Sequence, residues 1–324
     1  MSHAIHVHKY GGPEVMVWEE TVLGKPKPGE ALIRQTAVGL NFVDVYNRSG
    51  LYQAPLPTGL GAEGAGVIEA LGEDVTDLQV GDRVAYGNSP LGAYAEERLI
   101  PADRLVKLPD GIDDKTAAAM MLKGLTVQYL IRQIYKVKRG DTILCHAAAG
   151  GVGLILCQWA KHLGATVIGT VGSDAKAAEA KAHGCDHPIV YTREDFVKRV
   201  AEITDGKKVP VVYDGVGKDT FMKSLDCLAP LGLMVSFGNA SGPVENINLG
   251  VLAAKGSLFV TRPTLFTYAA KRESLLAMAK DLFDAVLSGG VKIQVNHTYP
   301  LKEAARAHRE LESRQTTGST VLTV

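Results

Sequence analysis

The sequence predicts an α/β protein in which a β-rich N-terminal domain precedes a doubly wound parallel sheet. Short strand-like runs separated by turns fill residues 1–110, and from residue 125 onward short strands alternate with helices. A glycine-rich turn joins the first strand of the alternating part to its helix. Such alternation is typical of a parallel sheet that helices cover on both faces.

The expected elements follow in order along the chain. In the N-terminal region we expect strands at Ala4–His8, Val15–Glu20, Ala31–Val38 and Val67–Glu69. In the alternating region we expect strands at Thr142–His146, Thr166–Thr170, Ile189–Tyr191, Val209–Tyr213 and Leu231–Phe237. The helices between these strands are expected at Val152–Leu163, Ala175–His183, Glu194–Ile203 and Thr220–Leu228.

The C-terminal part is expected to contain two helices, Glu273–Ser288 and Leu301–Ser313, and a last strand, Thr320–Val324. A single short strand needs a sheet to join, so this tail should return to the first domain. The sequence therefore predicts three parts: a first domain at 1–124, a parallel-sheet domain at 125–263, and a returning segment at 264–324.

Composition and charge argue against several classes of protein. Lysine plus arginine and aspartate plus glutamate each number 35, so a nucleic-acid partner or an electrostatic membrane attachment is not expected. The 4 cysteines form no closely spaced pair, which predicts reduced, buried thiols. The first ten residues lack the apolar segment of a signal peptide, and glycines interrupt the apolar run Thr142–Ala160. We therefore expect a cytoplasmic protein.

A dinucleotide-binding turn is predicted at Ala148–Gly153, where Gly150, Gly151, Val152 and Gly153 lie between an expected strand and an expected helix. Ala148 replaces the first glycine of the usual pattern. Glycines let the backbone approach a pyrophosphate, and the helix N-terminus offers free N–H groups and a positive dipole end. The alternative is a glycine turn that serves only helix–sheet packing.

The end of the following strand favours NADPH over NADH. An NAD site usually has an acidic residue there to bind the ribose hydroxyls, and none stands around Val171. Gly172, Ser173 and Lys176 instead flank the start of the next helix, where a 2′-phosphate could bind, and Tyr191 could lie nearby. We interpret Asp174 as a helix-capping side chain. Lys176 could alternatively be an ordinary solvated lysine.

The run Gly140–Gly153, continued by Gln158 and Lys161, resembles the signature of the quinone oxidoreductase/ζ-crystallin family of the medium-chain dehydrogenase/reductase superfamily. The resemblance covers the whole chain and is strongest to the bacterial NADPH:quinone reductases. Its further segments are Gly11–Val15, Asn41–Asp44, Ser49–Tyr52, Lys123–Thr126, Tyr213–Gly217, Phe237–Asn239, Thr261–Pro263 and Glu312–Arg314. It implies a GroES-like catalytic domain, a Rossmann domain, an active site in the cleft between them, and a homodimer formed through Rossmann-domain edges.

The zinc ligands of related dehydrogenases are missing from this sequence. Asn41 stands where zinc-dependent relatives have a first cysteine, and Ala62 stands where they have a histidine. Met121–Gly124 at the domain junction contains no cysteine, and no cysteine precedes Cys145. A catalytic zinc needs three protein ligands, so the resemblance implies a zinc-free enzyme for which alcohol oxidation is not expected.

The substrate is expected near Asn41, Tyr46 and Tyr52, and Asn41 and Tyr46 are also expected near the nicotinamide. The amide could make a polar contact and the phenols could bond or stack on a quinone. The alternatives are a helix N-cap for Asn41 and core packing for the tyrosines. Thr126 and Tyr129, at the domain junction, are expected to contact the nicotinamide end of the cofactor.

The remaining cofactor candidates follow the later strands. Loops at the carboxyl ends of parallel strands form the ligand crevice, so Val216, Phe237, Gly238 and Asn239 should approach the nicotinamide half. Arg262 and Arg314 match family positions near the cofactor, although either could be a surface ion pair.

The function that these observations imply is NADPH-dependent reduction of quinones by direct transfer from the nicotinamide, without zinc or flavin. The quinol oxygen has a pKa of roughly 10, similar to that of tyrosine, so water or a tyrosine could supply the proton. Two alternatives stay open: reduction of activated enones with NADPH, and a dinucleotide-binding protein with a structural or RNA-binding role.

Overall fold

The computed structural model describes residues 2–324, which form two compact units. The first unit comprises residues 2–125 together with Ala269–Leu287 and Ile293–Val324. The second comprises Thr126–Tyr268 and Ser288–Lys292, so it continues past residue 263, where the sequence predicted a boundary. Tyr268 belongs there because its ring stacks on that of Tyr129, with centroids 4.6 Å apart.

The first unit is built on a seven-stranded sheet in the order β15-β16-β3-β5-β6-β8, with β7 also paired to β3. Its strands are β3 (Glu30–Leu40), β5 (Gly64–Leu71), β6 (Arg83–Tyr86), β7 (Glu97–Pro101), β8 (Val106–Lys107), β15 (Val295–Pro300) and β16 (Ser319–Thr323). A smaller sheet contains β2 (Met16–Thr21), β1 (Ser2–Val7) and β4 (Thr58–Gly59), in that order. Ile33, Val38, Ile68 and Leu322 are fully or almost fully buried in one apolar core.

The C-terminal strand, β16, is an inner strand of this sheet, next to its edge strand β15. β16 runs antiparallel to β3, with Thr320 opposite Leu40, and parallel to β15. The unit's helices are α1 (Phe42–Ser49), the first part of α2 (Asp114–Tyr129), α9 (Arg272–Leu287) and α10 (Ala304–Glu312). Sequence analysis did not anticipate α2, whose apolar residues do not follow one face.

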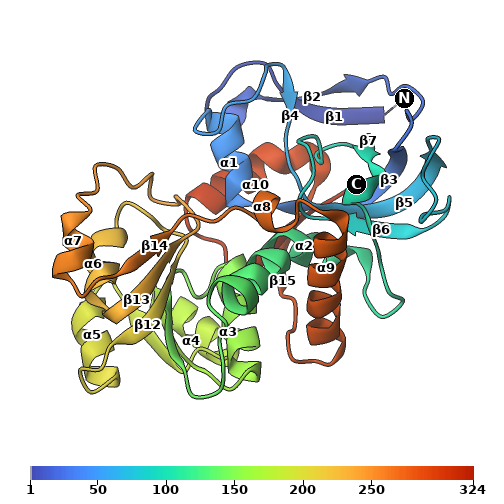
Figure 1. The fold of residues 1–324 in the computed structure, drawn as a ribbon. Coiled ribbons are helices and arrows are strands. Elements are labelled where there is room, and N and C mark those ends of the chain that lie inside the picture. Colours follow the sequence, from blue (N-terminus) through green and yellow to red (C-terminus); the bar gives the residue numbers. More distant parts are fainter. Residues whose placement is uncertain (1) are drawn as a thin grey trace. The chain divides into compact units, whose positions relative to one another are not determined.

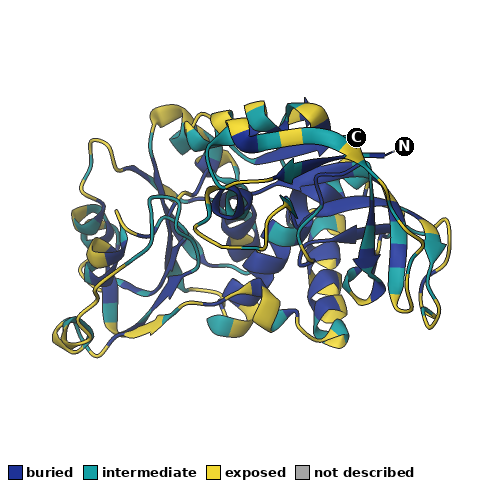
Figure 2. Cartoon of the chain, turned by 90° about the horizontal axis from the view of Figure 1, so that it is seen from above, coloured by how far each residue is buried: buried dark blue, intermediate teal, exposed yellow. Residues whose placement is uncertain are grey.

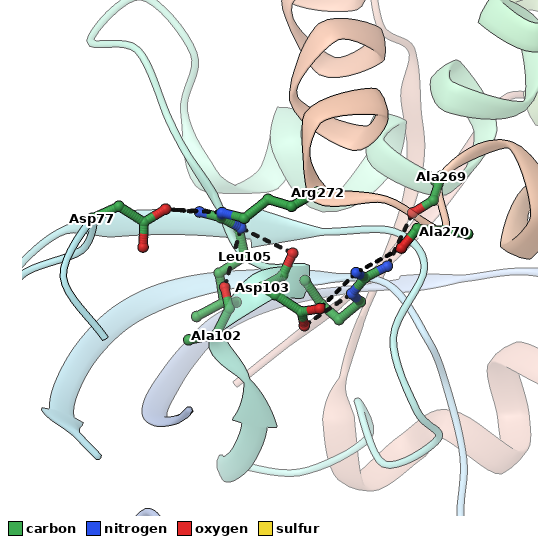
Figure 3. A network of polar contacts seen from close by, with 8 residues as sticks. Asp77, Ala102, Asp103, Leu105, Ala269, Ala270 and Arg272 are labelled. Atoms are coloured by element: carbon green, nitrogen blue, oxygen red, sulfur yellow. Dashed lines mark hydrogen bonds and ion pairs between the residues drawn. The ribbon is translucent and has the colours of Figure 1, made fainter. Parts of the chain in front are cut away.

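Hydrogen bonds from two arginines hold the returning segment, and Figure 3 shows those of Arg272. Arg272 donates to Asp77 at 2.8 Å and to the carbonyl oxygens of Ala102, Asp103 and Leu105. Arg104 donates to the carbonyl oxygens of Ala269 and Ala270 at 2.9 and 3.0 Å. Guanidinium donors therefore hold the chain at the point where it re-enters the first unit.

The second unit contains a six-stranded sheet in the order β11-β10-β9-β12-β13-β14, in which every pair is parallel. Its strands are β9 (Thr142–Cys145), β10 (Thr166–Val171), β11 (His187–Val190), β12 (Val209–Asp214), β13 (Leu228–Ser236) and β14 (Phe259–Thr261). Its helices are α3 (Gly151–His162), α4 (Asp174–Ala182), α5 (Phe196–Ile203), α6 (Phe221–Asp226), α7 (Gly250–Ala254) and α8 (Leu265–Tyr268). Figure 1 shows α3 and α4 on one side of the strands and α5 and α6 on the other.

This arrangement confirms the predicted doubly wound sheet, because the direction of strand addition reverses between β9 and β12. β13 begins three residues before the predicted Leu231, at Leu228, because an irregularity in its pairing with β12 lets it start earlier. Figure 2 shows the strands of both large sheets mostly in dark blue, which marks buried residues.

Two further expectations concern burial. Cys145, Cys157, Cys185 and Cys227 are all free thiols and all buried, as predicted. Within residues 2–324, no helix combines the length and the apolar character that crossing a membrane requires.

Candidate active site

The predicted dinucleotide turn leads from β9 into α3 in the second unit. Gly153 must be glycine, because a Cβ there would lie 2.3 Å from the carbonyl oxygen of Ala147 and 2.7 Å from the backbone of Ala148. Ala148 fits in place of a glycine because its neighbour on β10 is Gly169, where a Cβ would meet the Ala148 Cβ at 2.6 Å. Close contacts with the main chain therefore fix Gly153 in this turn.

The same turn has the features of an anion site. No side chain caps the N-terminus of α3, so its first N–H groups are not satisfied by a capping residue. At Gly150 the φ of −81° suits any residue, and a Cβ would meet only the Ala147 carbonyl oxygen, at 3.2 Å. Since the protein itself does not require glycine at Gly150, the missing side chain leaves room for a ligand. The residues present thus fit the pyrophosphate of a dinucleotide.

The residues predicted to read a 2′-phosphate gather at the end of β10. Ser173 is the N-cap of α4, and its hydroxyl accepts from the Lys176 N–H at 3.3 Å. Tyr191 lies beside Gly172, because a Cβ on that glycine would be 3.1 Å from the phenol oxygen. The interpretation of Asp174 as the cap is wrong: its carboxylate instead forms a two-point ion pair with Arg193 at 2.5 and 2.6 Å. Arg193, which sequence analysis did not consider, is thus ion-paired with the residue two positions before Lys176 in the chain.

The loops after β12 and β13 lie backbone to backbone. Buried Asp214 accepts from the N–H groups of Val216 and Gly217 at 2.7 and 3.1 Å, which shapes the first loop. A Cβ on Gly238 would lie 2.4 Å from the Gly215 carbonyl oxygen, so the second loop packs directly against the first. Arg262 donates to the Ser236 carbonyl oxygen at 2.8 Å. The structure therefore brings Val216, Phe237, Gly238, Asn239 and Arg262 together.

Two more candidates belong to the second unit at its boundary. Thr126 and Tyr129 lie on the last turn of α2, and both are buried. Burial raises the pKa of Tyr129, while a hydrogen bond with Thr126 acts in the opposite direction. The phenol is therefore neutral at physiological pH.

In the first unit, Asn41 joins a buried ionic cluster. Its side-chain N–H donates to Glu63 Oε2 at 2.7 Å, and the Lys123 ammonium lies 3.0 Å from the same oxygen. The backbone N–H of Leu122 donates to Glu63 Oε1 at 2.7 Å. Asn41 is also the N-cap residue of α1, which confirms the helix-cap interpretation. Its contact with the nicotinamide or the quinone stays a prediction. Because Glu63 takes the amide nitrogen, the orientation of the Asn41 amide is fixed.

A second polar chain continues from the first turn of α1. Asp44 Oδ2 accepts from the Asn41 backbone N–H at 2.9 Å and from the Tyr94 hydroxyl at 3.0 Å. Tyr94 contacts His308 Nε2 at 3.0 Å, and Arg48 donates to His308 Nδ1 at 3.0 Å. An arginine always donates, so the proton of the neutral histidine is on Nε2 and every donor in the chain points toward Asp44.

Burial dominates the electrostatics of this chain. Burial raises the pKa of Asp44 to about 7, although the Asn41 N–H, Tyr94 and Lys123 each lower it. The second oxygen of Asp44 is buried and has no hydrogen-bond partner within residues 2–324. Burial lowers the pKa of His308 to about 3, and the nearby Arg48 acts in the same direction.

Tyr46 and Tyr52 meet edge to face, with ring centroids 5.2 Å apart. Tyr46 is 8% exposed and Tyr52 is 39% exposed. The backbone N–H of Tyr52 also donates to the Tyr46 carbonyl oxygen at 3.1 Å. Tyr46 is therefore largely a core residue, and Tyr52 is the phenol that reaches the surface of the unit.

Arg314 belongs to the first unit, unlike the other predicted phosphate contacts. It follows α10 in a left-handed conformation, with a φ of 60°, and is exposed. Its backbone N–H donates to Leu311. Asn41, Tyr46 and Tyr52 share its unit, and the other predicted site residues lie in the second unit.

The residues present do not fit a catalytic zinc. The Asn41 nitrogen donates to Glu63, Ala62 has no ligand atom, and the Glu63 carboxylate is bound by the Lys123 ammonium. Elsewhere in the described chain, His, Cys, Asp and Glu side chains do not gather in threes that could hold a metal ion.

Comparison with known protein families first identifies the class of protein to which the chain belongs. The model for the alcohol dehydrogenase GroES-like domain matches residues 27–110, and that for zinc-binding dehydrogenase matches residues 151–280. A GroES-like domain followed by a Rossmann domain defines the medium-chain dehydrogenases and reductases, which confirms the predicted fold class.

Full-length relatives then give the family. The chain is 58% identical to a quinone oxidoreductase of Pseudomonas aeruginosa over 99% of each protein. It is 50% identical to a 2-haloacrylate reductase of a Burkholderia species, again over 99% of each. The crystal structure of Escherichia coli quinone oxidoreductase complexed with NADPH is 51% identical, with a TM-score of 0.98 over 99% of this chain and 100% of that one. The chain therefore belongs to the quinone oxidoreductase family.

Proposed function

We propose that this protein reduces quinones with NADPH by direct transfer from the nicotinamide, without zinc or flavin. The observation that carries the proposal is the likeness, over the whole chain, to a quinone oxidoreductase solved with NADPH. The uncapped start of α3 and the open side of Gly150 support it independently.

In this proposal the second unit holds the cofactor. Gly150, Gly151, Val152 and Gly153 bind the pyrophosphate through backbone N–H groups. The residues assigned to the 2′-phosphate are Gly172, Ser173, Lys176 and Tyr191. Those assigned to the nicotinamide half are Thr126, Tyr129, Val216, Phe237, Gly238, Asn239 and Arg262. We assign to Arg314 a contact with a cofactor phosphate, and to Asn41 and Tyr46 a position near the nicotinamide.

The quinone binds against Asn41, Tyr46 and Tyr52. NADPH supplies a hydride when bound, so the protein needs chiefly to position a flat acceptor and to exclude water. The Asn41 amide is held in one orientation by Glu63, and the ring of Tyr52 offers an aromatic edge. Such a lining suits a neutral molecule with two carbonyl oxygens.

The proposal that zinc takes no part rests on the side chains themselves. An amide donor, an alanine and an ion-paired glutamate occupy the positions where ligands would be needed. Elemental analysis should find no tightly bound zinc, and chelators should leave activity intact. About one zinc per chain would overturn this part of the proposal.

A second candidate function is reduction of activated enones. The 50% identity to a 2-haloacrylate reductase favours it, because that substrate accepts a hydride at a carbon–carbon double bond. Initial rates of NADPH oxidation with quinones, 2-haloacrylates, other enones and aldehydes separate the two. We expect the highest kcat/KM with quinones, and a higher value with enones would replace the first proposal by the second.

We also propose a cytoplasmic homodimer formed through the edge of the Rossmann sheet. β14 is an outer strand of that sheet, and Phe259 on it is 59% exposed. Exposed apolar residues on an unpaired strand edge are typical of an interface. Phe259→Glu should convert a dimer to a monomer in light scattering, whereas a monomeric unmodified protein would contradict the proposal.

A further inference from the structure

Lys123 is a buried cation that neither the fold nor the proposed site has explained. It lies on α2, two residues before the chain passes from the first unit to the second. Only 6% of its side chain is exposed. An ammonium group has three N–H donors, yet Glu63 Oε2 is its one hydrogen-bond acceptor within residues 2–324.

Both carboxylate oxygens of Glu63, in contrast, accept hydrogen bonds. One of its oxygens accepts from the Leu122 backbone N–H, and the other accepts from Asn41 and Lys123. The carboxylate is thus satisfied, while the ammonium keeps N–H groups for which these residues offer no acceptor. Burying unsatisfied donors on a charged group costs free energy that an apolar side chain would avoid. The Lys123 ammonium is therefore able to donate to an oxygen atom besides Glu63 Oε2.

We propose that the Lys123 ammonium binds the reducible oxygen of the substrate and donates a proton to it. This inference rests on the proposed function and names its proton donor. Adding a hydride to a quinone leaves negative charge on an oxygen, where a positioned cation stabilises it. An N–H bond of Lys123 breaks as the O–H bond of the quinol forms, and the resulting neutral amine regains its proton from water.

A lysine side chain and a quinol oxygen are chemically suited to proton transfer. Phenols and alkylammonium groups are acids of similar strength in water, so a lysine side chain is a suitable proton donor to a quinol oxygen. Glu63 orients Lys123 by a hydrogen bond, and through Asn41 the same carboxylate orients an amide beside it. Glu63 is therefore a positioning residue, and Lys123 is the proposed catalytic residue.

The rival explanation is that Lys123 merely neutralises Glu63. The double variant Lys123→Met/Glu63→Gln separates the two, because it removes both charges and leaves no buried charge without its counter-ion. Glu63→Gln alone is its control, because it places an amide N–H where Glu63 now accepts from Leu122 or Asn41. We expect Lys123→Met alone to lower Tm and the double variant to recover most of that loss. The kcat of the double variant with quinones should nevertheless stay about 100-fold below that of the unmodified enzyme. Recovery of kcat together with Tm would overturn the proposal.

A matched control comes from a lysine–carboxylate pair in the second unit. Lys255 pairs with Asp226, and Lys255→Met should leave kcat and KM unchanged. If Lys123→Met does not fold, the double variant alone decides the outcome.

A binding measurement tests Lys123 without turnover. 4-Nitrophenol, whose ionised form absorbs visible light, is titrated from low to high pH in the presence of enzyme and NADP⁺. We expect the unmodified enzyme to lower the apparent pKa of the bound phenol by one to two units and the double variant to lose that shift. Equal values for the two proteins would overturn the contact. Failure of the proposed function is distinguishable, because the unmodified enzyme would then reduce no quinone while the titration still reports on Lys123.

Discussion

The proposed nucleotide site and the proposed substrate site of this protein are built from different chemical groups. In the second unit, backbone groups form the predicted cofactor turn, and Gly153 and Gly238 are fixed by contacts with neighbouring main chain. In the first unit, the candidate site is formed by side chains instead. Asn41, Glu63, Lys123 and Asp44 are all buried and linked by hydrogen bonds. Binding at a site made of backbone groups depends on the space left for the ligand. Binding at a site made of side chains depends on their charge and protonation.

The largest expected effect tests how the free energy of unfolding depends on the charge of a buried side chain in the first unit. The pKa of Asp44 is about 7 in the folded protein against an ordinary 3.8, so the folded state binds the proton more tightly. The contribution of Asp44 to stability is thus present below pH 3.8 and is lost as pH rises to about 7. Asp44→Asn cannot ionise, and its oxygen still accepts from Asn41 and Tyr94. The variant should therefore gain about 4 kcal/mol relative to the unmodified protein between pH 4 and pH 8.

Denaturant unfolding at several pH values measures this difference. His308 has the opposite dependence, because its pKa is lowered from 6.5 to about 3, but it is present in both proteins and cancels. Tyr94, Lys123 and Glu63 also face Asp44 and are likewise unchanged. A pH-independent difference in stability would show that Asp44 is ionised throughout this range.

The next effect tests whether stability and cofactor binding in the second unit depend on the space beside two glycines of one turn. Gly153→Ala places a Cβ 2.3 Å from a carbonyl oxygen and should destabilise the protein by about 2–3 kcal/mol. Gly150→Ala meets its nearest atom at 3.2 Å and should change Tm little. Calorimetric titration should nevertheless show weaker NADPH binding to Gly150→Ala, because its methyl group fills the ligand's space. Unchanged affinity would remove Gly150 from the proposed pyrophosphate site.

A smaller effect is expected at Lys176. Replacing it by alanine should weaken NADPH binding about 5–30-fold, or about 1–2 kcal/mol, and leave NADH binding nearly unchanged. Parallel titrations of both nucleotides give the ratio. Arg193→Ala is the matched comparison, since Arg193 is already paired with Asp174. An equal loss for NADH and NADPH would show that Lys176 does not read the 2′-phosphate.

The smallest effect is expected at Tyr52, whose aromatic contact should contribute about 0.5–1.5 kcal/mol to quinone binding. Tyr52→Ala should raise KM for small quinones and leave the Kd of NADPH unchanged. Steady-state kinetics and nucleotide titration together test this. A loss of NADPH affinity with an unchanged quinone KM would make Tyr52 a cofactor or folding residue.

The same contrast explains what sequence analysis could predict. The Ala148–Gly153 turn is local, and its strand and helix signals adjoin it, so its place in the fold was predictable. Lys123 was invisible as a site because its partner is sixty residues away in the chain. Arg48 meets His308 across 260 positions, and no periodicity reveals such a pair. Ser173 and Asp174 are both good helix-capping residues, and the sequence does not show which of them caps α4. In the structure Ser173 is the N-cap, and the Asp174 carboxylate pairs with Arg193.

β16 has a consequence for the order in which this protein can fold. The strand is an inner strand of the first unit's sheet, between the edge strand β15 and β3, and Thr320 is paired with Leu40. A ribosome adding roughly 5–20 residues per second needs on the order of 10–40 s to pass from the end of α2 to the C-terminus. Until β16 is made, β3 has an open edge at Ala37–Leu40, although by then all strands of the second unit have been synthesised. The part of the chain made first is therefore the part completed last, and its exposed edge is where a chaperone would have to act.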